Sequence, residues 1–312
     1  MTTMNASMTD SNKNWPVFVS AGEALTDLVI EDPVQQRWVA KVGGSTWNVA
    51  RAVAALGLPS AFAGAISTDV FGDALWAASE AAGLDLRFLQ RVPKSPLLAV
   101  VHQTQPPRYF FIGDDSADLH FDAGPLPEGW IDHVQWVHFG GISLAREPLA
   151  SRLVSLASML KQHGVRISYD PNFRALMDER YDTTLRRMVE LADVVKVSDE
   201  DLAGLFRTAD VDRAFDTLRA WNPSATVLYT RGAEGASLHI GSEQWRSDAL
   251  RVQVVDTVGA GDASIAALLY SLMRRSDQSA QSHLRFAAAG GAAACTTVGA
   301  SPPTLAAIEN LL

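Results

Sequence analysis

The chain alternates between short apolar runs and longer segments in which apolar residues recur every three or four positions. Short apolar runs are typical of buried strands, and the wider spacing is typical of helices that pack through one face. Strands that alternate with helices predict a mainly parallel sheet covered by helices on both faces. From residue 134 onward, strand-like runs lie at 136–139, 165–169, 194–197 and 225–229, and helical segments lie at 148–163, 183–191, before 206 and at 211–221.

The two ends of the chain continue this pattern, with one exception. The segment 97–122 holds two strand-like runs, 97–102 and 109–112, joined by a turn at 103–107 without a helical segment, which predicts a hairpin. We expect it to pair with the region 25–41 as a small sheet outside the main layer. The remaining predicted elements are strands at 17–20, 25–30, 61–66 and 250–255 and helices at 48–56, 71–82, 263–273 and 281–297.

The length of 312 residues, with no internal repeat and no long linker, predicts one large α/β domain at 16–312 after a flexible tail at 1–15. The net charge is −9 and no Lys/Arg-rich run occurs, which argues against nucleic acid or an anionic membrane as a partner. The single cysteine, Cys295, excludes an internal disulfide and a cysteine metal site. The polar residues 1–15 are unlike a secretory signal, and no apolar run approaches the ~20 residues of a membrane span. We expect a cytoplasmic protein.

The most informative segment is 256–262, Asp-Thr-Val-Gly-Ala-Gly-Asp, which leads into the predicted helix at 263–273. A glycine turn at a helix start presents free N–H groups and the positive end of the helix dipole, which together bind anions. Asp262 places a carboxylate in that anion site. A phosphate site that also holds a base indicates attack of a hydroxyl on a phosphoryl group. The alternative is a glycine turn in which an Asp only caps the helix.

Several other chemistries lack support in the sequence. There is no Gly-x-x-x-x-Gly-Lys-Ser/Thr loop and no His-Glu-x-x-His motif. The segment 141–145 resembles a nucleophile elbow around Ser143 but lacks the closing glycine. Gly259-x-Gly261 resembles part of a dinucleotide fingerprint, but Asp262 would repel a pyrophosphate. A dehydrogenase and a serine hydrolase are therefore disfavoured.

Two further segments could bind a ligand. Gly43 and Gly44 permit close approach of a ligand to the backbone, and Asn48 offers a donor and an acceptor for hydroxyls, although a simple strand-to-helix turn fits equally well. Arg174 follows the strand-like run 165–169, and ligands of open α/β sheets bind outside the carboxyl ends of strands. An arginine there suits a phosphate oxygen or a surface ion pair.

These motifs resemble those of the ribokinase-like sugar kinases, the PfkB carbohydrate kinase family, along residues 17–300. The segment 43–57, continued to 69–72, resembles the first signature of that family, and 256–262 matches every specified position of the second. The resemblance implies a three-layer α/β/α fold in which the small sheet formed by about 25–41 and 97–122 is a lid. It also implies a homodimer through that lid.

The resemblance assigns roles by position. Asp262 would be the base, and the backbone N–H groups of Gly259, Ala260 and Gly261 would form the anion hole, with Arg174 beside it. The residues that would hold the sugar are Asp27, Gly43, Gly44, Asn48 and Arg108. The residues that would face MgATP are Lys196, Ser198, Thr230, Gly232 and Gly235. Asp201 would hold Mg²⁺ through water, where many members have the longer Glu, and Asp256 with the loop near Gly299 would hold a monovalent cation such as K⁺.

Within the family, 22–28 and the Arg108-Tyr109-Phe110-Phe111 run with Ala117-Asp118 resemble bacterial fructokinases. The resemblance therefore favours an ATP-dependent transfer of phosphate to D-fructose, giving fructose 6-phosphate. The alternatives are 2-keto-3-deoxygluconate kinase, ribokinase, aminoimidazole riboside kinase and nucleoside kinase. A sugar- or nucleotide-binding module without catalysis is a more remote alternative, because a pure binding protein gains nothing from a carboxylate opposite phosphate.

Overall fold

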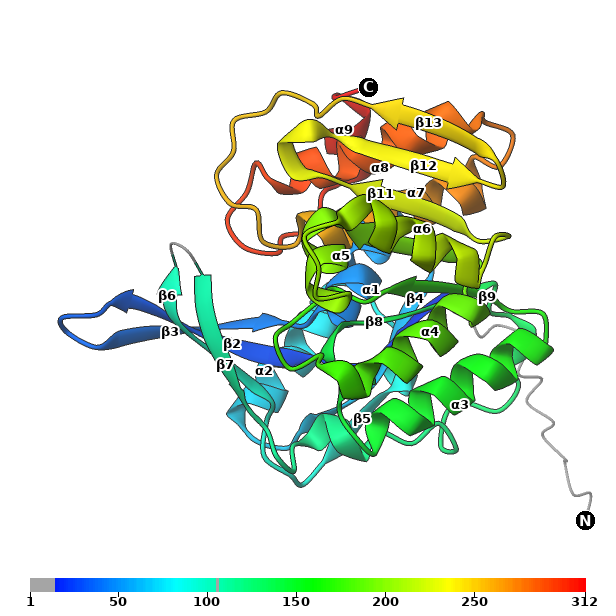
Figure 1. Cartoon of the computed structure of the whole chain (residues 1–312). Helices are drawn as coiled ribbons and strands as arrows, with labels where there is room; N and C mark the ends of the chain where they lie inside the picture. Colours follow the sequence, from blue (N-terminus) through cyan, green and yellow to red (C-terminus); the bar gives the residue numbers. More distant parts are fainter. Residues whose placement is uncertain (1–14, 105–106) are drawn as a thin grey trace, which may run out of the picture.

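The computed structural model describes residues 15–104 and 107–312, which form a large sheet, a small sheet and covering helices (Figure 1). The large sheet has the order β13-β12-β11-β10-β9-β8-β1-β4-β5. Its pairs are parallel from β11 to β5, and β12 and β13 are added antiparallel at one edge. Its strands are β1 (Phe18–Ala21), β4 (Ser60–Ser67), β5 (Leu89–Val92), β8 (Trp136–Gly140), β9 (Arg166–Asp170), β10 (Val194–Ser198), β11 (Thr226–Thr230), β12 (Ala236–Ile240) and β13 (Glu243–Ser247).

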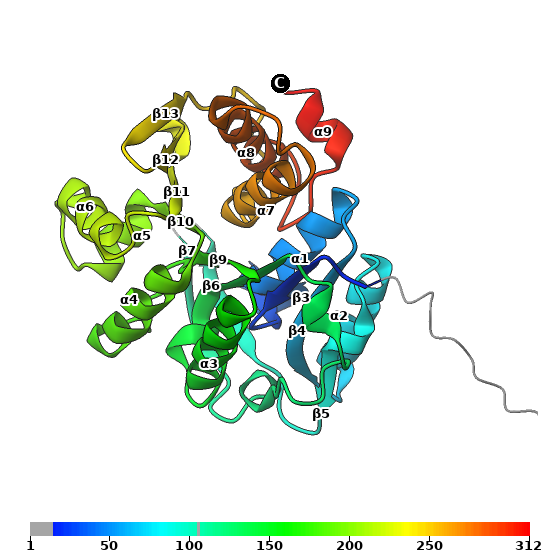
Figure 2. The same cartoon turned by 90° about the vertical axis from the view of Figure 1, so that its right-hand side faces the viewer.

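Helices cover both faces of the large sheet, as the alternating pattern predicts (Figures 1 and 2). One face packs against α1, α7 and α8, and the other packs against α3, α4 and α6. The α-helices are α1 (Ser45–Ala55), α2 (Val70–Ala81), α3 (Leu149–Gln162), α4 (Asp182–Leu191), α5 (Asp199–Leu205), α6 (Val211–Trp221), α7 (Ala260–Arg274), α8 (Ala280–Ala294) and α9 (Leu305–Glu309). Short 3₁₀ turns are η1 (Leu86–Phe88), η2 (Ala117–His120), η3 (Trp130–Asp132), η4 (Gly141–Ala145), η5 (Glu179–Tyr181) and η6 (Gly232–Glu234).

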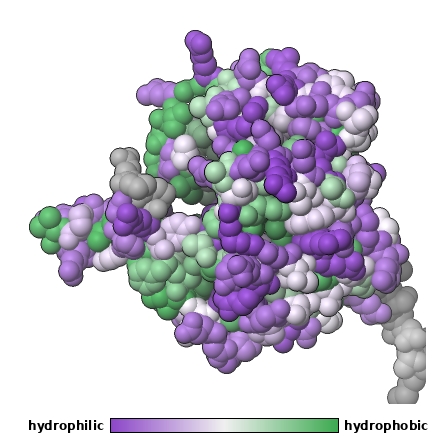
Figure 3. Space-filling model, viewed as in Figure 1, coloured by the Kyte–Doolittle hydropathy of each residue, from purple (hydrophilic) through white to green (hydrophobic). Residues whose placement is uncertain are grey.

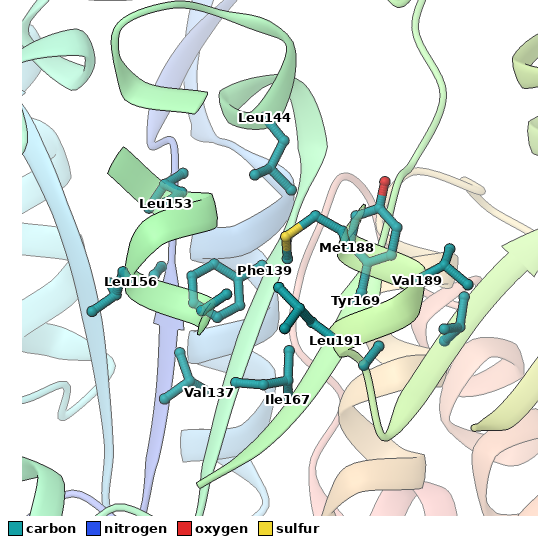
Figure 4. Packing of buried hydrophobic residues seen from close by; sticks show 14 of the residues in the cluster. Val137, Phe139, Leu144, Leu153, Leu156, Ile167, Tyr169, Met188, Val189 and Leu191 are labelled. Carbon is teal, nitrogen blue, oxygen red and sulfur yellow. The ribbon is translucent and has the colours of Figure 1, made fainter. Parts of the chain in front are cut away.

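The core between β8, β9 and the helices α3 and α4 is mainly apolar, and the hydroxyl of Tyr169 is paired with that of Tyr181 (Figure 4). Phe139 and Tyr169 project from the sheet and are completely buried, and Leu153 and Met188 meet them from the two helices. Burying a side chain of this size stabilises a fold by about 1.5–3 kcal/mol. This packing holds β8 and β9 in place against the two helices.

The small sheet is separate from the large one and has the order β3-β2-β6-β7. It projects from the body, as predicted for a small sheet outside the main layer, and is called the lid below (Figure 1). Its strands are β2 (Leu25–Asp32), β3 (Arg37–Gly43), β6 (Leu98–Thr104) and β7 (Pro107–Ile112). The predicted turn at 103–107 lies partly outside the described residues, and residues 113–122 leave the sheet as a connection that contains η2.

The structure corrects the pattern at one place and leaves one prediction outside its range. Residues 250–255 form no strand. They are a loop after the antiparallel pair β12–β13, and Val254 and Val255 in it are more than half exposed. Of the predicted tail at 1–15, residues 1–14 lie outside the described residues, and the ring of Trp15 stacks on His133. Within the described chain, no helix combines the length and the apolar character that a membrane span requires.

Candidate active site

The predicted site residues gather at the carboxyl ends of the parallel strands. The chain continues from β1 first to β4 and β5 on one side and later to β8, β9 and β10 on the other. Such a change of direction leaves a crevice at the strand ends, where open α/β sheets bind their ligands. Asp170 and Ser198 end β9 and β10 at this edge, and Lys196 of β10 reaches the first turn of α7 at Gly261.

Helix α7 begins at the predicted glycine turn. Its N-cap is Gly259, whose φ of 81° lies in the left-handed region that a side chain disfavours. The first turn of a helix has N–H groups without helical partners, and these attract an anion. The N–H of Ala260 donates to the Thr257 carbonyl at 3.2 Å. The turn therefore has the form of an anion hole, with one of its three predicted donors already engaged.

Asp262 is the third residue of α7 and is only 7% exposed. Its Oδ1 accepts a hydrogen bond from Ser45 Oγ at 2.7 Å, and its Oδ2 accepts one from Asn48 Nδ2 at 2.9 Å. Burial raises the pKa of Asp262, and the donors Ser45 and Asn48 and the charges of Lys196 and Arg174 oppose that rise. A carboxylate with a raised pKa that is held in one orientation is suited to take a proton.

The donors to Asp262 come from the start of α1, which begins at Ser45 rather than near residue 48. The N-cap Gly44 has φ 113°, and a Cβ there would lie 2.7 Å from the Glu23 carbonyl oxygen. This contact packs the beginning of α1 against the base of the lid. Asn48 Oδ1 is buried and has no hydrogen-bond partner among the described residues, so it remains available to a ligand hydroxyl.

Lys196 joins two carboxylates beneath the site. Its Nζ lies 3.1 Å from Asp170 Oδ2 and 3.5 Å from Asp201 Oδ2. A Cβ on Gly261 would lie 3.0 Å from the same Nζ, so the ammonium also reaches the first turn of α7. Burial raises the pKa of Asp170 to about 7, although Lys196 opposes that rise. The ammonium is therefore well placed to meet a phosphate oxygen.

Asp201 lies in a capping box at the start of α5. Its Oδ2 accepts from Ser198 N at 2.8 Å, its Oδ1 accepts from Phe173 N at 2.8 Å, and its own N–H donates to Ser198 Oγ. Although burial acts to raise it, the pKa of Asp201 is lowered by Lys196 and by these donors. Both oxygens are occupied, so this carboxylate can contact a metal through water more readily than directly.

Arg174 is held between the sheet edge and the lid. Its Nη1 donates to Asn172 Oδ1 at 2.6 Å and to the Phe173 carbonyl at 2.7 Å, and its guanidinium lies 5.9 Å from the Tyr109 ring of the lid. Burial raises the pKa of Asp262 and raises that of Asp27 to about 6, and the charge of Arg174 opposes both rises. Arg174 thus faces the predicted sugar residue Asp27 as well as the predicted base.

Arg108 is not brought to this cluster. Asp27 pairs with Ala99, which pairs with Phe111, so these side chains and that of Tyr109 share one face of the lid. Arg108 alternates with Tyr109 and lies exposed on the opposite face. Its role in sugar binding stays a prediction. Gly43, in contrast, lies directly against Asp27, because a Cβ on it would meet Asp27 Oδ2 at 2.6 Å.

The predicted nucleotide residues line the next strand ends. Ser198 is in register with Thr230 across β10 and β11, and Gly232 and Gly235 bound the η6 turn that follows. Asp256 accepts from Val258 N at 3.1 Å and from Gly299 N at 2.8 Å, which joins the two loops predicted to hold a monovalent cation. Among the described residues, no three His, Cys, Asp or Glu side chains are clustered as a metal site.

Comparison with known proteins agrees with this geometry. The family model described as pfkB family carbohydrate kinase matches residues 18–307. The chain is 31% identical over 257 residues to a fructokinase of Escherichia coli, covering 80% of this chain and 82% of that protein. It is 32% identical over 292 residues to a fructokinase of Vibrio alginolyticus, covering 89% and 92% of the two chains.

Solved structures of the same class superpose closely. The fructokinase of Xylella fastidiosa with bound ATP has a TM-score of 0.86 at 29% identity, covering 95% of this chain and 98% of that one. The fructokinase of Vibrio cholerae in its fructose-, ADP- and calcium-bound form has a TM-score of 0.82 at 29% identity, with the same coverage. The putative ribokinase II of Escherichia coli, in complex with ATP and Mg²⁺, has a TM-score of 0.83 at 25% identity.

Proposed function

Because the chain belongs to the pfkB family of carbohydrate kinases, we propose that it is an ATP-dependent fructokinase that converts D-fructose to fructose 6-phosphate. The observation that carries the proposal is the Asp262 carboxylate, held by Ser45 and Asn48 within the anion-binding turn of α7. In the proposed reaction the sugar hydroxymethyl oxygen bonds to the γ-phosphorus, the bond from that phosphorus to the β–γ bridging oxygen breaks, and ADP leaves. Asp262 takes the hydroxyl proton.

The remaining residues of the site position the reactants and stabilise charge. Phosphoryl transfer needs in-line placement and stabilisation of the equatorial oxygens more than covalent help from the protein. The N–H groups of Gly259 and Gly261, that of Ala260 once it leaves the Thr257 carbonyl, the α7 dipole and Lys196 would provide that stabilisation. Asp27, Gly43, Gly44 and the unpaired Asn48 Oδ1 would bind the sugar hydroxyls.

ATP would lie along the strand ends beside Ser198, Thr230, Gly232 and Gly235. When bound, Mg²⁺ would neutralise charge on the phosphates, and the engaged oxygens of Asp201 favour contact through water, as Mg²⁺ commonly retains its own. Asp256 and the loop at Gly299 would hold a monovalent cation such as K⁺. The Vibrio cholerae fructokinase double mutant was described in a fructose-, ADP- and potassium-bound form. A kinase that consumes ATP is expected to act in the cytoplasm.

Asp27 favours a neutral sugar over the acid substrate of a 2-keto-3-deoxygluconate kinase. Its carboxylate lies on the lid face that points to the site, and a pKa of about 6 leaves it mostly charged at neutral pH. A sugar carboxylate placed there would be repelled, although Arg174 would attract it. We therefore expect kcat/KM with ATP and Mg²⁺ to be highest for fructose when fructose, ribose and 2-keto-3-deoxygluconate are compared.

The test of catalysis is Asp262→Asn, which keeps the shape of the side chain and removes the base. We expect kcat to fall by about 10²–10⁴, because general-base catalysis contributes that much. Asp277→Asn, an exposed change after the end of α7, is the matched control and should retain wild-type kcat. Equal activity of Asp262→Asn and wild type in an ADP-release assay would contradict the kinase proposal.

The lid is proposed to form a homodimer. Its outer face exposes Trp38, Phe110 and Ile112 at 40–51%, and Figure 3 shows apolar surface on the projecting lid. Exposed apolar residues on an open sheet invite pairing with another chain. A single monomeric species in sedimentation velocity at micromolar concentration would refute this part of the proposal.

A further inference from the structure

The chain crosses between the body and the lid four times: before β2, from β3 to α1, before β6 and after β7. One body segment contacts the first and the last of these connections, which lie at Glu23 and at Gly113. The segment 143–146, at the end of η4, makes side-chain hydrogen bonds to both connections. Ser143 belongs to the 141–145 motif that resembled a nucleophile elbow and that the proposed reaction does not use.

At the first connection, before β2, a buried carboxyl group makes the hydrogen bonds. Glu23 is 2% exposed, and its Oε2 accepts hydrogen bonds from Ser143 Oγ and, at 3.2 Å, from Ser143 N. The Glu23 carbonyl accepts a hydrogen bond from Thr46 Oγ1 at 2.9 Å in the first turn of α1. Glu23 therefore links the base of β2 to Ser143 through its side chain and, through its carbonyl, to the helix that supplies Ser45 and Asn48 to the predicted base.

At the last connection, after β7, one arginine donates hydrogen bonds to three residues. Arg146 Nη1 donates to Asp118 Oδ2, and its Nη2 donates to the Gly113 carbonyl and, at 3.0 Å, to Ser116 Oγ. The Asp118 side chain is fully buried and that of Arg146 is 13% exposed. A planar guanidinium can bridge three acceptors in this way, and an ammonium cannot reproduce its fork geometry.

The other side of the last connection is open. Residues 112–115 line a cavity of about 640 Å³ together with Thr68, Asp69 and residues 93–96. A cavity offers no packing atoms. Beside the cavity the connection is held by the exposed pair of Lys94 with Asp115. The buried hydrogen bonds of Arg146 hold it from the body.

We propose that Ser143 and Arg146 are positioning residues that set the position of the lid, and so of Asp27, relative to Asp262. This inference rests on the proposed function only for its kinetic consequence. Neither side chain is among the residues proposed to touch the reactants. Loosening the lid should weaken sugar binding by Asp27 while Asp262 stays in place, so KM for fructose should rise more than kcat falls.

The test compares Arg146→Lys and Ser143→Ala with Arg186→Lys, an exposed change on α4 in an i,i+4 ion pair with Glu190. Hydrogen exchange is measured first, without substrates. We expect lid amides in 98–104 and 108–112 for Arg146→Lys, and in 25–32 for Ser143→Ala, to exchange about tenfold faster than in wild type, since each variant loses a buried hydrogen bond. The amides of β8–β10 should be unchanged, and the control should match wild type throughout.

Kinetics with fructose are measured second. For both variants we expect KM to rise about fivefold with kcat within twofold of wild type. The inference would be overturned if the lid amides of both variants exchanged at the wild-type rate. It would also be overturned if exchange became faster to the same extent over the large sheet. Should Arg146→Lys fail to fold, Ser143→Ala, which removes one hydroxyl, decides alone. If wild type does not phosphorylate fructose, the proposed function fails, while faster lid exchange would still support the positioning role.

Discussion

The strand-end site and the lid meet around the same proposed substrate, but they are stabilised in different ways. At the strand ends, Asp262, Lys196 and Asp201 are each at most 7% exposed and each has several polar partners. The lid is a single layer of strands with exposed aromatic side chains, and its one acidic site residue, Asp27, is only partly buried. Buried, fully paired groups hold a geometry that phosphoryl transfer needs, whereas a thin sheet can move to admit and enclose a sugar.

The largest effect is expected from Lys196→Met, because it leaves Asp170 and Asp201 without their shared cation. Removing one partner of a buried ion pair costs about 3–5 kcal/mol, which predicts a fall in Tm of roughly 10 °C. Loss of the ammonium beside the α7 turn should also lower kcat by about 10²-fold. Thermal unfolding and ADP-release kinetics measure the two effects.

The control for this change is Lys161→Met, whose exposed partner Asp193 lies at 2.7 Å. An exposed ion pair contributes about 0–1 kcal/mol, so Tm should hardly move. Equal Tm changes for the two lysine variants would mean that the strand-end cluster is not more tightly constrained than the surface, and the contrast with the lid would fail.

The second effect concerns the orientation of Asp262. Ser45→Ala removes the donor to Oδ1, and a hydrogen bond to a charged group is worth about 1.5–3 kcal/mol. Since that donor favours the charged form, its loss should raise the pKa of Asp262 further. We expect the acid limb of the kcat/KM profile to move to higher pH and kcat/KM at pH 7 to fall about tenfold, the factor that corresponds to about 1.4 kcal/mol. Ser155→Ala, on the exposed face of α3, should leave the profile unchanged.

The sequence predicted the site residues that lie close together in the chain. It missed a contact between residues that lie far apart in the chain. Asp262 and the turn at 259–261 form one contiguous motif, so their helix and anion geometry follow from local pattern alone. Ser45 was missed because its partner is 217 positions away and a lone serine at a helix start is typical of an ordinary cap. The contact of Ser143 with Glu23 joins residues 120 positions apart and could not be predicted for the same reason.

The fold shows the same division between local and distant information. The alternation of strands and helices predicted the layers, because each element's own periodicity reports which side is buried. The strand predicted at 250–255 was wrong because alternating apolar residues do not show whether a neighbouring strand is available, and Val254 and Val255 remain exposed. The face on which Arg108 lies depended on the register of β6 with β7, which no single-strand pattern determines.

The smallest effect is expected in the lid, where Asp27→Asn should separate function from stability. The pKa of Asp27 in the folded protein, about 6, lies above its ordinary value of 3.8. The unfolded chain therefore loses its proton first, and stability falls as pH rises from about 4 through 6. Asp27→Asn removes this cost, so it should raise the free energy of unfolding at pH 8 by about 1 kcal/mol and have no such effect below pH 4. Urea unfolding at the two pH values measures the difference, and Glu31→Gln, exposed on the same strand, should show none.

Fructose KM should rise at the same time in Asp27→Asn, because the variant loses a charged acceptor for sugar hydroxyls. A variant that is destabilised at pH 8 would show that the Asp27 carboxylate is held as favourably as the strand-end acids, and the distinction between the two regions would no longer hold.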